Sequence, residues 1–246
     1  MLINDSSTVS AACDSSSAIT SGNVATQYSG TVTSAIVGNC VKTISDEAFY
    51  KCSGLVSIVI PDSVTSIGAE AFWGCSGLTN IVIPDSVTSI GEWCFDSCSG
   101  LTSLTVSSGI TTIKARTFSR CTGLTSIIIP DSVTGISGSA FSRCTSLSSV
   151  TIGSSVKNIG SYVFNECTSL LGVDIPNSTK TIGDSAFSSC SGLTSITILA
   201  TTPPTLGTSV FDNTNNCPIY VPSASVNTYK SASGWRTYAD RIQAIT

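Results

Sequence analysis

The sequence repeats itself every 23 residues, and this regularity constrains the fold more than any other feature. A fixed period of about 20–50 residues indicates a solenoid or a related array, in which each repeat stacks on the next. Phenylalanines and cysteines mark the period as Phe49, Phe72, Phe95, Phe118, Phe141, Phe164 and Phe187, each followed three residues later by Cys52, Cys75, Cys98, Cys121, Cys144, Cys167 and Cys190. We therefore expect both series to form continuous columns of buried side chains along the axis of the molecule.

One unit, residues 55–75, shows how a single coil is expected to fold. Leu55, Ile58 and Ile60 have the spacing of a strand whose inward side chains are apolar, and the proline that follows ends ladder pairing. A second short extended segment comes next, and Gly68 permits the bend into a corner. The Ala-Phe-x-x-Cys sequence at the end of the unit has i, i+1, i+4 spacing, which predicts one face of a single helical turn.

This unit matches the pattern L-x-x-I-x-I-P-x-S-V-x-x-I-G-x-x-A-F-x-x-C at every defined position, and it thereby resembles the BspA-like leucine-rich repeats. The resemblance extends over roughly residues 32–211, and the closing stretch 218–245 looks like the ending of Bacteroides-type members. It implies an α/β repeat solenoid, that is, a right-handed leucine-rich-repeat superhelix with a parallel β-sheet, 23-residue coils and short helical turns at the corner. It also implies a surface protein of mucosal bacteria with a role in adhesion, and it carries no catalytic motif.

The repeat divides the chain into three parts. Residues 1–31, which are rich in Ser and Thr, are interpreted as a polar N-terminal cap or linker, and residues 32–214 as the solenoid. We call the repeating series from Cys52 to Cys190 the ladder cysteines. Residues 215–246 are interpreted as a C-terminal capping segment, because Phe211 falls 24 residues after Phe187 and Thr214 stands where the next ladder cysteine is expected. Capping segments are expected because the end coils of a solenoid need a cover.

Composition disfavours several classes of function. The chain has no histidine, which removes the common nucleophile arrangements, and it has no P-loop or dinucleotide-binding motif, so we predict no enzyme and no cofactor. With 11 basic and 15 acidic residues the net charge is −4, which disfavours nucleic-acid binding. No apolar run reaches membrane-spanning length, so membrane insertion is not expected. Residues 1–5 lack the features of an export signal, so we expect either a signal removed upstream or another route to the surface.

The eleven cysteines raise the question of disulfides. Ladder cysteines should lie about one strand spacing, ~4.8 Å, apart with parallel side chains, whereas a disulfide needs roughly 3.5–4.5 Å between Cβ atoms. We therefore expect buried, unbridged thiols that pack beside phenylalanine. Cys94 and Cys98 form C-x-x-x-C through their register in the repeat and not as a redox pair. The redox state of Cys13, Cys40 and Cys217, which lie off the ladder, stays open.

Aspartates occupy one turn position in three coils, at Asp62, Asp85 and Asp131. The first two are expected to be near neighbours, which makes a shared calcium ion one interpretation. The other is that each carboxylate supports its own turn, as Asp after Pro commonly does. Because Ser108 interrupts the series, we favour turn stabilisation and predict no metal site.

Two sets of residues that should face outward differ from coil to coil, while the buried residues repeat. Such variable surface positions can carry binding specificity. On the first strand they are Val59, Val82, Thr105, Ile128, Thr151, Asp174 and Thr197, which we interpret as a flat scaffold face in preference to a binding site. At the corner, the aromatic residues are Tyr50, Trp73, Trp93 and Tyr162. Exposed aromatic side chains anchor protein partners and can stack on sugars, although they can also shield the apolar atoms of the corner itself.

Basic residues gather in the middle of the chain. Residues 111–160 contain only one acidic residue, and their basic residues are Lys114, Arg116, Arg120, Arg143 and Lys157. Lys114 and the three arginines are the candidate basic patch, which could orient an acidic glycan or protein; ordinary solvation is the alternative.

Together these features predict one kind of function: a non-catalytic, surface-exposed adhesion or ligand-binding module that recognises a protein or glycan on a host or neighbouring cell, and that is monomeric. The alternative is a structural or spacer component of a cell surface or of a phage particle. The expected location is therefore extracellular or on a cell surface, with a phage particle as the second choice.

Overall fold

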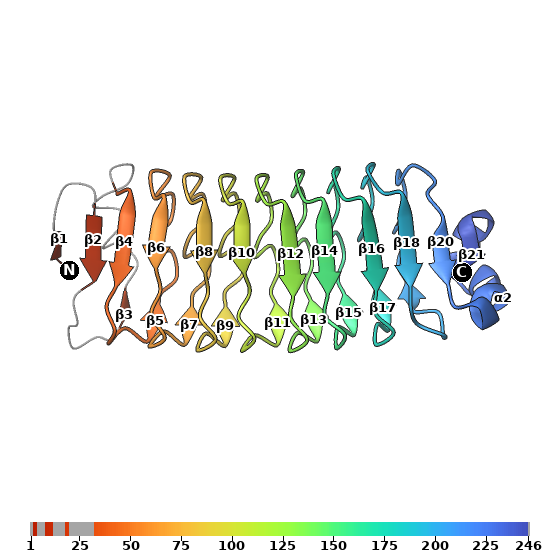
Figure 1. Ribbon diagram of the computed structural model, residues 1–246, viewed down its shortest axis with the longest axis horizontal. Coiled ribbons are helices and arrows are strands. Elements are labelled where there is room, and N and C mark those ends of the chain that lie inside the picture. Colours follow the sequence, from red (N-terminus) through yellow and green to blue (C-terminus); the bar gives the residue numbers. More distant parts are fainter. Residues whose placement is uncertain (1, 4–7, 12–17, 20–31, 246) are drawn as a thin grey trace.

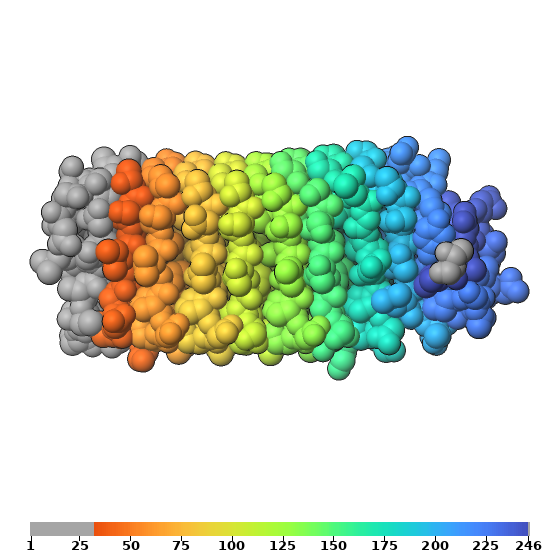
Figure 2. Space-filling view, in the orientation of Figure 1, coloured from red at the N-terminus to blue at the C-terminus, as the bar shows by residue number. Residues whose placement is uncertain are grey.

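The structure, a computed structural model, describes residues 2–3, 8–11, 18–19 and 32–245 and forms a straight rod of stacked coils (Figure 1). Each coil contributes one strand to a first column, whose members within the solenoid are β4 (Ser34–Val37), β6 (Ser57–Val59), β8 (Asn80–Val82), β10 (Ser103–Thr105), β12 (Ser126–Ile129), β14 (Ser149–Ile152), β16 (Gly172–Ile175), β18 (Ser195–Ile198) and β20 (Ile219–Val221). Hydrogen bonding groups them in the orders β4-β6, β8-β10, β12-β14 and β16-β18-β20. Figure 2 shows the rod as a continuous, elongated body.

The register of these strands confirms the 23-residue coil. Ile127 pairs with Val150 and Val173 with Ile196, and both pairs are parallel and 23 residues apart. Inward residues are buried and outward residues are exposed in most of these strands, as in the alternating pattern eBeB of β12 and β14. The interval read from the sequence is therefore a physical stacking interval, and the parallel-sheet solenoid is confirmed.

A second column of two-residue strands runs along another side of the rod. It forms two sheets, one containing β3 (Ala18–Ile19), β5 (Thr43–Ile44), β7 (Ser66–Ile67) and β9 (Ser89–Ile90), the other β11 (Thr112–Ile113), β13 (Gly135–Ile136), β15 (Asn158–Ile159), β17 (Thr181–Ile182) and β19 (Thr205–Leu206). The break between β9 and β11 coincides with Lys114, which occupies the position held by Gly91 in the preceding coil. A Cβ at Gly91 would overlap the backbone nitrogen of Ala69, so this position brings successive coils very close together.

The N-terminal strands continue both columns. β2 (Thr8–Ala11) pairs in parallel with β4, β3 pairs in parallel with β5, and β1 (Leu2–Ile3) pairs antiparallel with β2. The remainder of segment 1–31 lies outside the described residues, and its interpretation as a polar cap or linker stays a prediction.

The corner that precedes the first strand differs from the expected helical turn. It consists of consecutive turns in which an amide bonds to the carbonyl three residues earlier, as from Ser119 to Arg116 (3.1 Å) and from Cys121 to Phe118 (3.4 Å). Other amides point along the axis, so that Phe118 N donates to Ala140 O of the next coil (2.9 Å). An α-helical turn would commit its amides to carbonyls four residues earlier. The observed turns instead leave some amides free to donate hydrogen bonds to carbonyls of the neighbouring coil.

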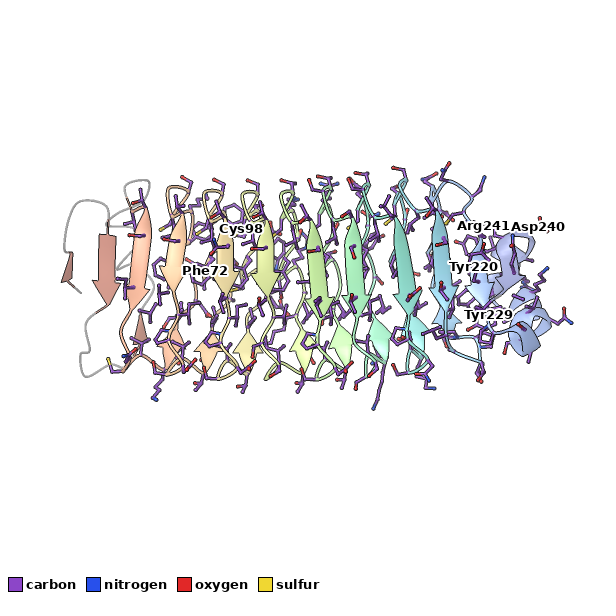
Figure 3. The ribbon with its side chains drawn as sticks, in the orientation of Figure 1. Phe72, Cys98, Tyr220, Tyr229, Asp240 and Arg241 are labelled. Atoms are coloured by element: carbon purple, nitrogen blue, oxygen red, sulfur yellow. The ribbon has the colours of Figure 1, made fainter. Side chains whose placement is uncertain are left out.

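Stacked phenylalanines form the centre of the core. Their rings are at most 1% exposed, and neighbouring ring centroids from Phe49 to Phe211 lie 5.0–5.8 Å apart with interplanar angles of 3–21°. Figure 3 shows Phe72 and Cys98 inside the rod. The predicted phenylalanine column is therefore confirmed, and Phe211 continues it despite the 24-residue spacing.

The ladder cysteines are free thiols and buried, as predicted. Each thiol from Cys75 onward donates a weak hydrogen bond to the phenylalanine carbonyl of the preceding coil, for example from Cys121 Sγ to Phe95 O at 3.2 Å. Off the ladder, Cys217 is free and buried whereas Cys40 is disulfide-bonded; Cys13 lies outside the described residues.

We expect the ladder cysteines to resist alkylation in the folded protein. Burial raises the pKa of Cys52 to about 11 and that of Cys144 to about 12, and only the thiolate is a good nucleophile. Iodoacetamide at pH 7.5 should therefore leave all seven unmodified by peptide mass spectrometry, and label them all in guanidinium chloride. A Val82→Cys variant supplies a positive control, because Val82 is 66% exposed. Rapid native labelling of Cys98 would contradict the buried column.

The C-terminal residues close the rod with a small mixed cap, as Figure 1 shows. It comprises β20, two 3-10 helices η1 (Ser223–Ser225) and η2 (Trp235–Arg241), the helix α2 (Val226–Ser231) and the strand β21 (Ile242–Ala244), which pairs in parallel with β20. Trp235, Tyr238 and Ile242 are buried. No helix among the described residues is both long enough and apolar enough to span a membrane.

Candidate binding surface

The corner turns hold two positions of each coil in the left-handed region of backbone conformation. These positions carry large side chains in the middle of the chain, with φ of 59° at Trp93, 54° at Arg116, 56° at Arg120, 62° at Arg143 and 61° at Tyr162. A residue other than glycine costs roughly 1–2 kcal/mol in this conformation. The fold therefore presents these side chains at sites where glycine would be the locally favoured residue.

The predicted corner aromatics form two separate clusters. Tyr50 and Trp73 stack with ring centroids 4.9 Å apart and an interplanar angle of 16°, and Lys51 Nζ lies 5.1 and 5.3 Å from the two centroids. In the second cluster the Arg116 guanidinium lies 4.2 Å from the centroid of the Trp93 ring. Trp73 and Trp93, although in adjacent coils, are thus each covered partly by their own cation.

The three arginines of the basic patch come together, and two of them are paired with acids. Arg143 forms an ion pair with Glu166 of the next coil at 3.2 Å, and Arg120 lies 3.6 Å from the buried carboxylate of Asp96. Arg116 has no carboxylate within 4 Å in the part of the chain that the structure describes. Local charge is therefore least compensated at Arg116.

Lys114 lies apart from these arginines. Its Nζ donates to Ser89 Oγ at 3.3 Å, and its side chain lines a different hollow beside the second strand column. The structure thus brings together three of the four predicted basic residues.

A depression lies between the arginines and Tyr162, and we call it the corner depression. Its volume is about 520 Å³, and it is lined by three arginines, Tyr162, Asn165, Glu166 and five serines. Arg116, Ser139 and Tyr162 hold equivalent positions in three successive coils, so a small side chain separates two large ones. This difference in size explains the hollow, and the serines that form it were not predicted from the sequence.

Two further hollows lie along the second strand column, with volumes of about 620 and 630 Å³. Small residues make their floors, among them Gly183 in one and Gly68 in the other. The repeated glycine after the second strand was the sequence signal for such a surface, although it predicted only a bend. The two hollows hold no arginine and no aromatic side chain.

The predicted outward positions of the first strand are exposed except Thr197, which is half-buried, and together they form a flat face. Val59, Val82 and Ile128 are 61%, 66% and 68% exposed. The hollow beside Ile128 has a volume of only about 240 Å³. The interpretation of this face as a scaffold remains a prediction.

Two of the three predicted turn aspartates, Asp85 and Asp131, connect coils and do not support their own turns. Asp131 Oδ1 accepts hydrogen bonds from Ser154 N (2.6 Å) and Ser154 Oγ (2.9 Å), and Asp85 makes the same pair of bonds with Ser108. These bonds lower the pKa of both carboxyl groups. The described residues include no group of three or more side chains able to hold a metal ion.

Comparison with known proteins agrees with this architecture. The sequence pattern of the family described as "BspA type Leucine rich repeat region", in six copies, matches residues 22–147 and 112–233. A leucine rich cell surface protein from Faecalibacterium prausnitzii A2-165 is 26% identical with a TM-score of 0.50, and the similarity covers 90% of this chain and 65% of that one. This chain thus spans less than two thirds of that protein's length.

A second solved structure, the leucine rich repeat protein of T. pallidum, is 25% identical with a TM-score of 0.58 over 86% of this chain and 85% of that one. No curated protein is detectably similar in sequence. The family match spans most of the chain, and the 23-residue coils have the stacking that the family pattern implies. The chain therefore belongs to the BspA-type leucine-rich repeat family.

Proposed function

We propose that this chain is a non-catalytic binding module of a cell surface, and that it recognises a protein or a glycan through its corner surface. We define the corner surface as Tyr50, Lys51, Trp73, Trp93, Arg116, Arg120, Arg143, Tyr162 and Glu166. Family membership supports this function, as does the likeness to a protein described as a leucine rich cell surface protein. The disulfide at Cys40 is also in keeping with an oxidising location outside the cytosol.

The observation that carries the proposal is the concentration of aromatic and arginine side chains on one edge of an otherwise uniform rod. Trp, Tyr and Arg are the side chains most enriched among residues that dominate binding energy. Here the fold holds Trp93, Tyr162 and the three arginines in left-handed positions. Stacking fixes Trp73 against Tyr50 and Arg116 against Trp93. Such side chains lose little conformational freedom when a partner binds.

We expect Trp73→Ala or Trp93→Ala to weaken binding to a ligand found on an array of glycans and host extracellular proteins. Loss of a central aromatic anchor costs about 2 kcal/mol, or roughly 30-fold in affinity. Surface plasmon resonance would measure the change, and Val82→Ala, which removes an exposed apolar side chain from the flat face, is the matched control. Affinity unchanged in both tryptophan variants would remove the corner surface as the binding site.

The rod shape favours one other function, that of a spacer which holds another domain away from a surface. The coils are joined along the axis by backbone hydrogen bonds, which suits a stiff element (Figure 1). A spacer would bind nothing on the array, and its corner variants would behave as the parent does. Genes for capsid or tail proteins beside the gene for this chain would place that spacer in a phage particle.

A further inference from the structure

The chemistry of the corner depression excludes an apolar ligand. Small-molecule pockets are mostly apolar, whereas this one is lined by serine hydroxyls, the Asn165 amide and charged side chains. An apolar ligand would bury these groups without hydrogen-bond partners, which costs free energy for each group. A ligand rich in hydroxyl groups would supply both donors and acceptors. The lining therefore suits a saccharide.

Arg116 indicates that the ligand carries a negative charge. Arg120 and Arg143 already lie beside Asp96 and Glu166, but Arg116 has no carboxylate partner among the described residues. Its guanidinium lies against the Trp93 ring at 4.2 Å, and this contact leaves the edge of the guanidinium available for hydrogen bonds. A planar guanidinium held in this way matches a carboxylate, which can accept two parallel hydrogen bonds.

Tyr162 supplies an apolar surface at the other end of the depression. Its side chain is 48% exposed, and it lies two coils beyond Arg116 with Ser139 between them. Two coil steps correspond to roughly 9–10 Å. The apolar face of a sugar ring can stack on such an aromatic ring while a neighbouring part of the same ligand reaches Arg116.

We propose that the corner depression binds a carboxylate-bearing saccharide, with Arg116 pairing with the carboxylate and Tyr162 stacking on a sugar ring. This inference rests on the proposed binding function and names the ligand class of its central part. A flat acidic protein surface fits less well, because it would leave the serine-lined hollow unfilled.

The test uses isothermal titration calorimetry with two acidic probes, tetragalacturonate and sialyllactose, and their neutral counterparts galactotetraose and lactose. We expect one acidic probe to bind at least tenfold more tightly than its neutral counterpart. The two arms distinguish a uronic acid from a sialic acid as the source of the carboxylate. Equal binding of acidic and neutral probes, or no binding of either acidic probe, would overturn the proposal.

Variants separate the depression from general attraction between charges. Arg116→Gln and Tyr162→Ala should each weaken binding about tenfold or more, and Arg116→Lys should restore only part of it, because lysine cannot form the bidentate pair. Ser139→Tyr should abolish binding by filling the hollow without adding charge; the same position holds Tyr162 in the next coil, so the fold accepts tyrosine there. Lys157→Gln removes the same charge outside the depression and should leave binding unchanged.

The outcomes also separate this inference from the proposed function. If Trp73→Ala weakens binding to an array ligand while Arg116→Gln and Ser139→Tyr do not, the binding module stands and the depression is not its ligand site. If an acidic protein binds and neither acidic saccharide does, the ligand class is wrong. Circular dichroism and the melting temperature of each variant establish that it is folded. If Arg116→Gln is not folded, Ser139→Tyr provides the second test of the depression.

Discussion

Replacing Phe141 with alanine should destabilise the protein by about 3–5 kcal/mol, the usual cost of truncating a buried aromatic side chain. The Phe141 ring is fully buried between Phe118 and Phe164, with centroid distances of 5.4 Å to each. The variant would lose both stacking contacts at once. Neighbouring coils cannot close the cavity, because hydrogen bonds such as that from Phe141 N to Val163 O (2.9 Å) set their spacing.

Thermal unfolding followed by circular dichroism would measure this effect, which corresponds to a fall in melting temperature of roughly 6–20 °C for a chain of this size. Because a repeat protein is stabilised chiefly by contacts between neighbouring units, the transition can also divide into two parts on either side of the altered coil. Ile128→Ala is the matched control: it truncates an apolar side chain in the same coil that is 68% exposed. Similar melting temperatures for both variants would contradict the stacked core.

The fold could be predicted from the sequence because the same pattern of residues recurs in each 23-residue coil. The spacing of the phenylalanines gives the coil, and the spacing of Ile58 and Ile60 within a coil gives the inward face of the first strand. Each inference is repeated many times along the chain, so a single substitution such as Thr214 for the ladder cysteine does not obscure it. Repetition also fixes which residues are neighbours, since residues 23 positions apart lie side by side.

The backbone of the corner could not be predicted in the same way. Ala71, Phe72 and Cys75 share a buried face both in a helical turn and in the observed turns, so their spacing does not distinguish the two conformations. The observed turns depend on residues in the left-handed conformation, such as Glu70, and a glutamate in the sequence gives no indication of a positive φ. Bonds between amides and carbonyls of adjacent coils decide the conformation, and these are properties of the stack.

The candidate site was predicted only in part, for a related reason. The aromatic and basic side chains are conspicuous in the sequence, but the depression forms where side chains are small, as at Ser139 and Ser142. Serine is abundant throughout this chain, so its presence there carried no signal. The ion pair of Arg143 with Glu166 follows from the period once columns are aligned, whereas the pair of Arg120 with Asp96 joins residues 24 positions apart and crosses between columns.

The C-terminal cap is the other place where a single side chain has a large effect. Trp235 is fully buried, its Nε1 donates to Pro204 O at 2.7 Å, and its ring lies 6.0 Å from Phe211, the last member of the phenylalanine column. Tyr229 packs edge-on against the indole at 4.8 Å and donates to Ala200 O at 2.7 Å. The indole thus links the cap to the final coil by both packing and a hydrogen bond.

Trp235→Ala should therefore cost about 3–5 kcal/mol through lost packing, with about 1–3 kcal/mol more if the Pro204 carbonyl stays buried without a donor. Uncovering the end of the rod also exposes Phe211 and the edge of the last strand, so we expect self-association as well as a lower melting temperature. Scanning calorimetry and light scattering would measure the two effects. Trp235→Phe retains most of the ring and removes the hydrogen bond, so it should lose stability but stay monodisperse. A Trp235→Ala protein that melts with the parent and does not associate would show that the column needs no cover at this end.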